Sequence, residues 1–159
     1  MPKTSFNIVI LLAALAFGLM IASGVMATRL SAGSWLDYAF TARQTQRFLY
    51  AYTIQDIALH RWVTTHLSLA MPITLAAFAI TMIRHDLDHK KYAFLVALAV
   101  WASVVDYAEN LVIVSLLDGG GAFRLKAALT LIKIALLLPP QTVAVYLFLK
   151  TAKTRLSAA

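Results

Sequence analysis

Three ionisable side chains and an amide lie in the middle of two long apolar runs in the C-terminal half of the chain. The first run, residues 93–117, contains Asp106, Glu109 and Asn110, and the second, residues 125–149, contains Lys133. A charge at the centre of a membrane helix costs about 2.5–3.5 kcal/mol, so these groups need partners or water. Carboxyl, amide and ammonium groups held together in an apolar setting can bind a polar group or exchange protons.

The spacing of these residues predicts which of them meet. The two apolar runs are joined by the turn Asp118-Gly119-Gly120-Gly121. In an antiparallel hairpin folded about Gly121, Glu109 and Lys133 lie equally far from the turn, at 121 − 109 = 12 and 133 − 121 = 12 residues. We therefore expect the Glu109 carboxylate and the Lys133 ammonium to lie at one depth and to form an ion pair.

The helical period places the charged residues on one face. At about 100° per residue, Asp106, Glu109 and Asn110 share a face of their helix, and Trp101 points away from it. This face should turn inward, because a charged stripe cannot face lipid. With two carboxylates and a single ammonium, the acids are expected to share a proton and to titrate as a coupled pair.

The composition indicates an integral membrane protein. Of 159 residues, 61% are hydrophobic, compared with about 45–50% in typical soluble domains. Four apolar stretches, near residues 8–28, 63–83, 93–117 and 125–149, are long enough to cross about 30 Å of hydrocarbon. Because backbone groups in lipid must be bonded internally, these stretches are expected to be helices. The fold class is therefore an all-α membrane protein, a single domain over residues 1–159 built as an up-down bundle of four transmembrane helices.

Charge and cysteine content restrict the function classes. The chain has no cysteine, which excludes disulfide exchange and thiolate catalysis, and no cofactor is implied. Its formal charge of +7 comes from basic residues that flank the apolar stretches, which favours anionic membrane lipids over nucleic acid as partners. The basic residues next to the chain ends and in the second connection lie close to the span ends, so both termini are expected in the cytoplasm.

The first connection, residues 29–62, is predicted to contain a helix. Apolar side chains recur on one face over residues 44–62, and Arg43, Arg47, Asp56 and His60 supply polarity, as in an amphipathic helix at a membrane surface. This segment could cap the helix ends or gate a lateral entrance. Its residues Arg43, Arg47 and Arg61 could also meet lipid phosphate.

Several further residues are candidates for a site or for a bend. His66 could join Glu109 and Lys133 from above, although a packing role is the more common one for an isolated histidine. Lys126, Thr130, Lys133 and Gln141 share one stripe of the last span, so Thr130 is a ligand-binding candidate as well. Pro72 and the pair Pro139-Pro140 predict kinks in the second and fourth spans.

A metal site is only weakly indicated. His85 and His89 stand four residues apart in the second connection, a spacing that zinc could use on a helix. The same spacing recurs by chance, and an ordinary solvated loop is the expectation here.

At the D-x-x-E-N motif of residues 106–110, followed by Lys133 and preceded by Pro72, the chain resembles a group of small bacterial four-helix membrane proteins. The resemblance implies a bacterial inner membrane and the bundle fold, but no activity. Members of that group commonly have an aromatic residue after the lysine, where this chain has Ile134.

Three functions fit these residues. The first is a binding protein whose polar pocket, formed by Asp106, Glu109, Asn110, Lys133 and possible further members His66 and Thr130, holds the polar end of a lipid-like or small amphipathic molecule. The second is a non-catalytic accessory subunit of a larger membrane complex or a homo-oligomer, in which the charges only lock the hairpin and the face of Ala14, Gly18 and Ala22 docks on a neighbour. The third is an intramembrane acid–base enzyme or a proton or ion pathway, and catalysis is the less favoured reading.

Overall fold

The computed structural model of the protein describes residues 3–87 and 92–157, and every regular element in these ranges is helical. The elements are α1 (Lys3–Ala27), η1 (Leu36–Tyr38), α2 (Ala42–Ala51), α3 (Ile54–Trp62), the π-helical turn η2 (Val63–Leu67), α4 (Ser68–Asp86), α5 (Ala93–Leu117) and α6 (Phe123–Leu156).

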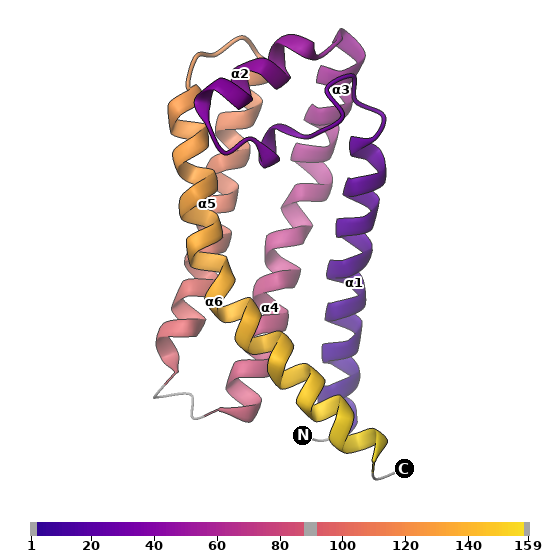
Figure 1. Cartoon of the computed structure of the whole chain (residues 1–159). Coiled ribbons are helices and arrows are strands. Elements are labelled where there is room, and N and C mark those ends of the chain that lie inside the picture. The colour runs from indigo at the N-terminus through magenta and orange to yellow at the C-terminus, as the bar shows by residue number, and fades with distance from the viewer. Residues whose placement is uncertain (1–2, 88–91, 158–159) are drawn as a thin grey trace.

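Four long helices stand side by side in an up-down bundle (Figure 1). The helices that are long and apolar enough to cross a membrane cover Phe6–Ala27, Ile54–Asp86, Ala93–Leu117 and Phe123–Leu156. Large apolar side chains such as Leu11, Phe17 and Leu111 are exposed on their outer surfaces, as expected where lipid is the solvent. The predicted fold class is confirmed, and the third span begins and ends at the predicted residues.

The first connection folds over one end of the bundle, opposite the two chain termini (Figure 1). The amphipathic segment predicted over residues 44–62 consists of two helices, because the chain is extended at Tyr52 and Thr53. Thr53 then caps α3 by accepting a hydrogen bond from Asp56 N–H, and Asp56 bonds back to the Thr53 backbone. Only α2 lies across the bundle end, whereas α3 continues through η2 into α4 (Figure 1).

Pro72 lies inside α4 and removes the N–H that would bond the carbonyl of Ser68. The neighbouring helix α5 supplies the replacement, because Asn110 Nδ2 donates to Ser68 O at 3.5 Å. Tyr107 and Ser103, which lie on the same side of α5, donate to the carbonyls of Leu69 and Pro72 at 2.7 and 3.1 Å. A donor from a neighbouring helix thus replaces the backbone bond that Pro72 cannot make.

The pair Pro139-Pro140 does not unwind the last span. α6 is helical throughout, with Pro139 and Pro140 inside it. It slants across the front of α4 and reaches the base of α1 (Figure 1), where Phe148 stacks on Phe6 with the ring centroids 6.0 Å apart.

Two apolar cores fill the bundle, one toward the termini and one beneath the first connection. Buried residues of the first core include Ala79, Met82, Ala99 and Ala144. The second contains Trp35, Leu36, Val63 and Ile113. On α5 the ionisable residues 106 and 109 lie between Ala99 and Ile113, so the two cores are separated by a charged layer.

Candidate functional site

Lys133 lies between the two acids of the D-x-x-E-N motif. Its ammonium contacts Asp106 Oδ1 at 2.8 Å and forms an ion pair with Glu109 Oε2. The pairing of Glu109 with Lys133, predicted from their equal distance to the turn, is therefore present. On the same helix Ala99 and Ala102 are buried and Trp101 is exposed, as the predicted inward face requires.

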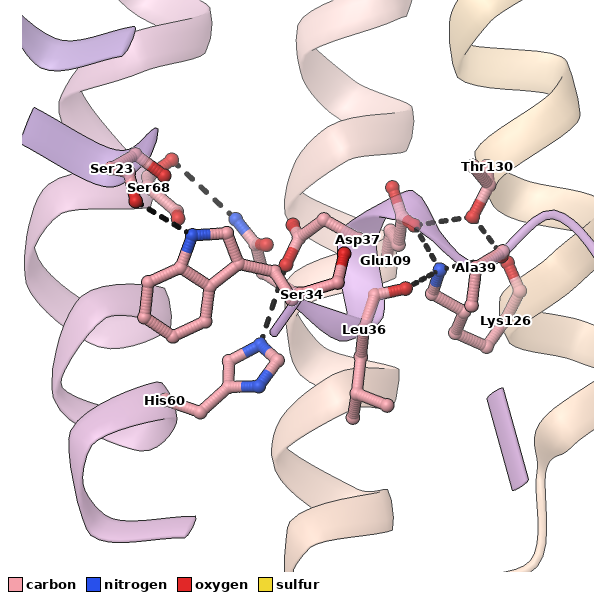
Figure 2. Close-up of polar contacts among 12 residues, drawn as sticks. Ser23, Ser34, Leu36, Asp37, Ala39, His60, Ser68, Glu109, Lys126 and Thr130 are labelled. Carbon is pink, nitrogen blue, oxygen red and sulfur yellow. Dashed lines mark hydrogen bonds and ion pairs between the residues drawn. The ribbon is translucent and has the colours of Figure 1, made fainter. Parts of the chain in front are cut away.

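A second lysine, Lys126, reaches the other oxygen of Glu109. Lys126 Nζ lies 3.3 Å from Glu109 Oε1, and both side chains are fully buried. The ammonium also donates to the carbonyls of Leu36, which begins η1, and of Ala39, which follows it (Figure 2). All three hydrogens of this ammonium thus have acceptors, which satisfies the requirement for burying a charge.

Thr130 completes the surroundings of Glu109. Its hydroxyl lies 2.5 Å from Glu109 Oε1 and 3.1 Å from Lys126 O, one turn back along α6 (Figure 2). Lys126, Thr130 and Lys133 lie on the stripe predicted for the last span, and Gln141 continues it by donating to Leu75 O of α4. Two ammonium groups therefore face the two acids of α5, whereas the expectation of a shared proton counted Lys133 alone. The coupled titration of Asp106 and Glu109 stays a prediction.

The first connection adds a third acid and a histidine to the layer. Asp37, inside η1, lies with Oδ2 3.3 Å from Nε2 of the fully buried His60. Burial alone would raise the pKa of Asp37, but the hydrogen bond and charge of His60, together with the charges of Lys133 and Lys126, lower it to about 2. Asp37 is thus a carboxylate at neutral pH.

Tyr52 fixes the orientation of His60. The Tyr52 hydroxyl donates its hydrogen to Ser34 O at 2.8 Å, so it must accept from His60 Nδ1, 3.0 Å away. The other ring nitrogen, Nε2, faces the Asp37 carboxylate, so the ring is held between Tyr52 and Asp37. Burial, followed by the negative charges of Asp37 and Asp56, raises the pKa of Tyr52, so the phenol keeps its proton.

Two small cavities meet at the Asp106–Lys133 pair. One, of about 110 Å³, lies between α4, α5 and α6 beside Pro72 and Leu137. The other, of about 90 Å³, lies beneath η1 and is lined by Trp35 and Asp37. Asp106, Lys133 and Met71 line both, and the two charged side chains keep 17% and 15% of their surface exposed. Each cavity is smaller than the roughly 300–1,000 Å³ of pockets that enclose a whole drug-sized ligand.

The six predicted site residues differ in whether they line a cavity. Asp106 and Lys133 line the cavities, whereas Glu109 and Thr130 are buried behind them against Lys126. Asn110 is directed toward the carbonyl of Ser68, and its Oδ1 has no hydrogen-bond partner among the described residues.

His66 lies outside this cluster. The π-helical turn η2 shifts the phase of the helix, so that Val63 and Thr64 are buried and His66 is exposed, stacked on Trp62. Its Nδ1 lies 2.9 Å from the carbonyl of Trp62.

The weakly indicated metal pair, His85 and His89, lies only partly within the residues that the structure describes. His85 lies in the last turn of α4 and contacts the carboxylate of Asp86 at 2.7 Å. His89 lies outside the described residues. Within residues 3–87 and 92–157, no group of three or more histidine, aspartate or glutamate side chains is arranged to hold a metal ion.

Sequence reasoning missed Lys126, Asp37 and His60 as members of the charged layer. Lys126 could have been found, because it shares a helix face with Thr130 and Lys133, at offsets of four and seven residues. Asp37 and His60 meet through an irregular segment, and no spacing rule links them.

Comparison of the chain with protein-family models, with curated proteins and with solved structures finds no match in any of the three.

Proposed function

We propose that this integral membrane protein binds the polar end of a small amphipathic molecule beside Asp106 and Lys133. The observation that carries the proposal is that two cavities meet at this one ion pair, which together with Asp37 is the partly exposed part of a charged layer whose other members are buried. Intramembrane ionisable groups next to a cavity are expected to have a functional role.

The charges at the pair suit a ligand with both a donor and an acceptor. Two hydrogens of the Lys133 ammonium are directed at Asp106 and Glu109, which leaves a third for an acceptor atom of the ligand. Asp106 and Asp37 line the cavity beneath η1 and can accept hydrogen bonds. Only a short polar group of the ligand fits into cavities of this volume. The apolar part of the ligand would lie along Leu75 and Leu137 toward the lipid.

The orientation is part of this proposal. The connection between α1 and α3 would face the exoplasmic side of a bacterial inner membrane, with the termini in the cytoplasm, because the basic residues at the terminal end lie close to the spans. The ligand would then reach its cavities from the exoplasmic half of the membrane.

Native mass spectrometry with lipid extraction on the gently solubilised protein tests the binding. Leu137→Phe fills the cavity between α4, α5 and α6 without changing a charge, whereas Leu138→Phe adds the same volume to a side chain that is 60% exposed. We expect a released small molecule from the unmodified protein and from Leu138→Phe, and its loss from Leu137→Phe and from Asp106→Asn. Equal release from all four proteins would reject this site.

A second function, that of an accessory subunit, is favoured by the inner part of the charged layer. Glu109 and Lys126 are fully buried and satisfied by each other, by Thr130 and by backbone carbonyls, as in a device for packing helices. Gly18, on the predicted docking face of α1, has no atom within 4 Å of the position of a Cβ. A stoichiometric partner chain that co-purifies with the protein, with no small molecule bound, would favour this function.

A further inference from the structure

The end of the bundle that carries the first connection has an excess of unpaired positive charge. Its acids are engaged within the protein: Asp118 pairs with Arg61, Asp37 with His60, and Asp56 accepts hydrogen bonds from Ser31 and Thr53. Four arginines at this end, Arg29, Arg43, Arg47 and Arg124, are exposed and have no ion pair within the described residues.

Two of these arginines, from different elements, line a single groove. Arg43 lies in the first turn of α2 and Arg124 in the first turn of α6, and the groove between them has a volume of about 420 Å³. Its remaining lining residues carry no charge: Ala42, Gln46, Gly121, Ala122, Phe123 and Leu125. Two guanidinium groups therefore share a groove that contains no carboxylate to neutralise them.

We propose that this groove binds the phosphate group of an anionic phospholipid. A guanidinium binds phosphate oxygens through two parallel N–H donors, and arginines on two walls can hold one headgroup between them. Gln46 supplies a further amide donor.

The apolar part of the groove favours a lipid over a soluble anion. Phe123 and Leu125 belong to the same groove, and Leu125 exposes half of its surface on the lipid-facing side of α6. Tyr38 and Phe40, in and just after η1, are also exposed at this end, as aromatic side chains are at the level of lipid headgroups. A headgroup between the arginines would place its acyl chains beside Leu125. This site is separate from the Asp106–Lys133 cavities and does not depend on the proposed function.

The test is titration of phosphatidylglycerol and, in parallel, phosphatidylcholine onto the delipidated protein in detergent, followed by native mass spectrometry. The variants are Arg43→Gln, Arg124→Gln and the double variant, and the matched control is Arg84→Gln, in the last turn of α4 at the other end of the bundle. We expect phosphatidylglycerol to bind more tightly than phosphatidylcholine, each groove variant to weaken it about fivefold, and Arg84→Gln to leave it unchanged.

Three results would overturn the proposal. The first is equal affinity for the two lipids, and the second is a double variant that binds phosphatidylglycerol as the unmodified protein does. In the third, inorganic phosphate at the same concentration displaces the lipid from the unmodified protein but not from the double variant, which would assign the groove to a soluble anion. Because Arg43 and Arg124 are exposed, the melting temperatures of the variants should match that of the unmodified protein, so that a loss of binding is not a loss of folding.

Discussion

Lys126 Nζ lies 3.3 Å from Glu109 Oε1, and neither side chain exposes any surface. The same ammonium donates to the carbonyls of Leu36 and Ala39, so it ties η1 to the pair formed by α5 and α6. The charged layer thus has two parts: a closed part at Glu109 and Lys126 that fixes the first connection, and a part open to cavities at Asp106 and Lys133.

Removal of Lys126 should be the most damaging single change in the closed part. Lys126→Met leaves the Ala39 carbonyl without its ammonium donor, the Leu36 carbonyl with only the N–H of Ala39, and Glu109 with one positive charge fewer beside it. We expect a loss of about 3–5 kcal/mol in the free energy of unfolding, measured by denaturant titration in detergent micelles. Adding Glu109→Gln to Lys126→Met should recover part of the loss, because the uncompensated charge is then removed.

Two lysines serve as comparisons for this prediction. Lys133→Met should cost less than Lys126→Met, since Asp106 and Lys133 are partly exposed and can be hydrated. Lys150→Met, at an exposed position near the end of α6, should have no effect. If Lys126→Met and the double variant are as harmless as Lys150→Met, the ion pair contributes nothing to folding.

The hydrogen bond from Asn110 to Ser68 should contribute to the free energy of unfolding only because Pro72 lacks an N–H. In Pro72→Ala, the new backbone N–H can bond Ser68 O within α4, so the amide of Asn110 is no longer needed there. We therefore expect the cost of Asn110→Leu to be about 1 kcal/mol smaller in the Pro72→Ala background than in the unmodified protein, measured as a double-mutant cycle.

The control for this cycle is Leu111→Ala, at a neighbouring position on α5 that faces lipid. Its cost should be the same in both backgrounds. A cost of Asn110→Leu that is also independent of residue 72 would show that the amide does not replace the missing helix bond.

The parts of this fold that sequence reasoning predicted are those governed by helical periodicity. The pairing of Glu109 with Lys133 follows from two straight helices and one turn, because 3.6 residues per turn and equal distances fix both face and depth. The inward face of α5, with Trp101 on the outside, follows from the same period.

Apart from Lys126, which lies on a regular face of α6, the parts that were missed depend on irregular backbone. Asp37 approaches His60 because η1 folds back under the bundle end, and the phase shift that exposes His66 arises in the π-helical turn η2. Neither departure from regular helix has a periodic signal in the sequence. The cavities beside Asp106 are set by how side chains pack around Pro72 and Met71, which composition does not determine.

The stability of the protein should depend on the charge of Asp37 at low pH. Its pKa is about 2 in the folded protein against an ordinary value of 3.8, so between these values the unfolded chain binds more protons than the folded one. The contribution, about 2 kcal/mol, is complete above about pH 4 and is lost as the pH falls through 2. The difference in unfolding free energy between the unmodified protein and Asp37→Asn should shrink over the same range.

The neutral neighbour Tyr38 provides the reference for this pH profile. The difference between the unmodified protein and Tyr38→Phe should not change between pH 6 and pH 2. A difference for Asp37→Asn that stays constant down to pH 2 would mean that packing, and not the carboxylate charge, is what the substitution removes.

The turn between α5 and α6 should tolerate a methyl group at one glycine and not at the other two. Gly119 has φ +91°, a conformation that side chains rarely adopt, and a Cβ on Gly120 would lie 2.7 Å from the carbonyl oxygen of Ser115. A Cβ on Gly121 would meet nothing within 4 Å. We expect Gly119→Ala and Gly120→Ala each to lower the unfolding free energy by about 1 kcal/mol or more, and Gly121→Ala to leave it unchanged. The turn joins α5 to α6, so we expect it to fix how the two helices align. Gly119→Ala and Gly120→Ala should then also weaken the coupling free energy between Glu109 and Lys133, measured in a double-mutant cycle. An unchanged coupling free energy would show that helix packing alone fixes the alignment.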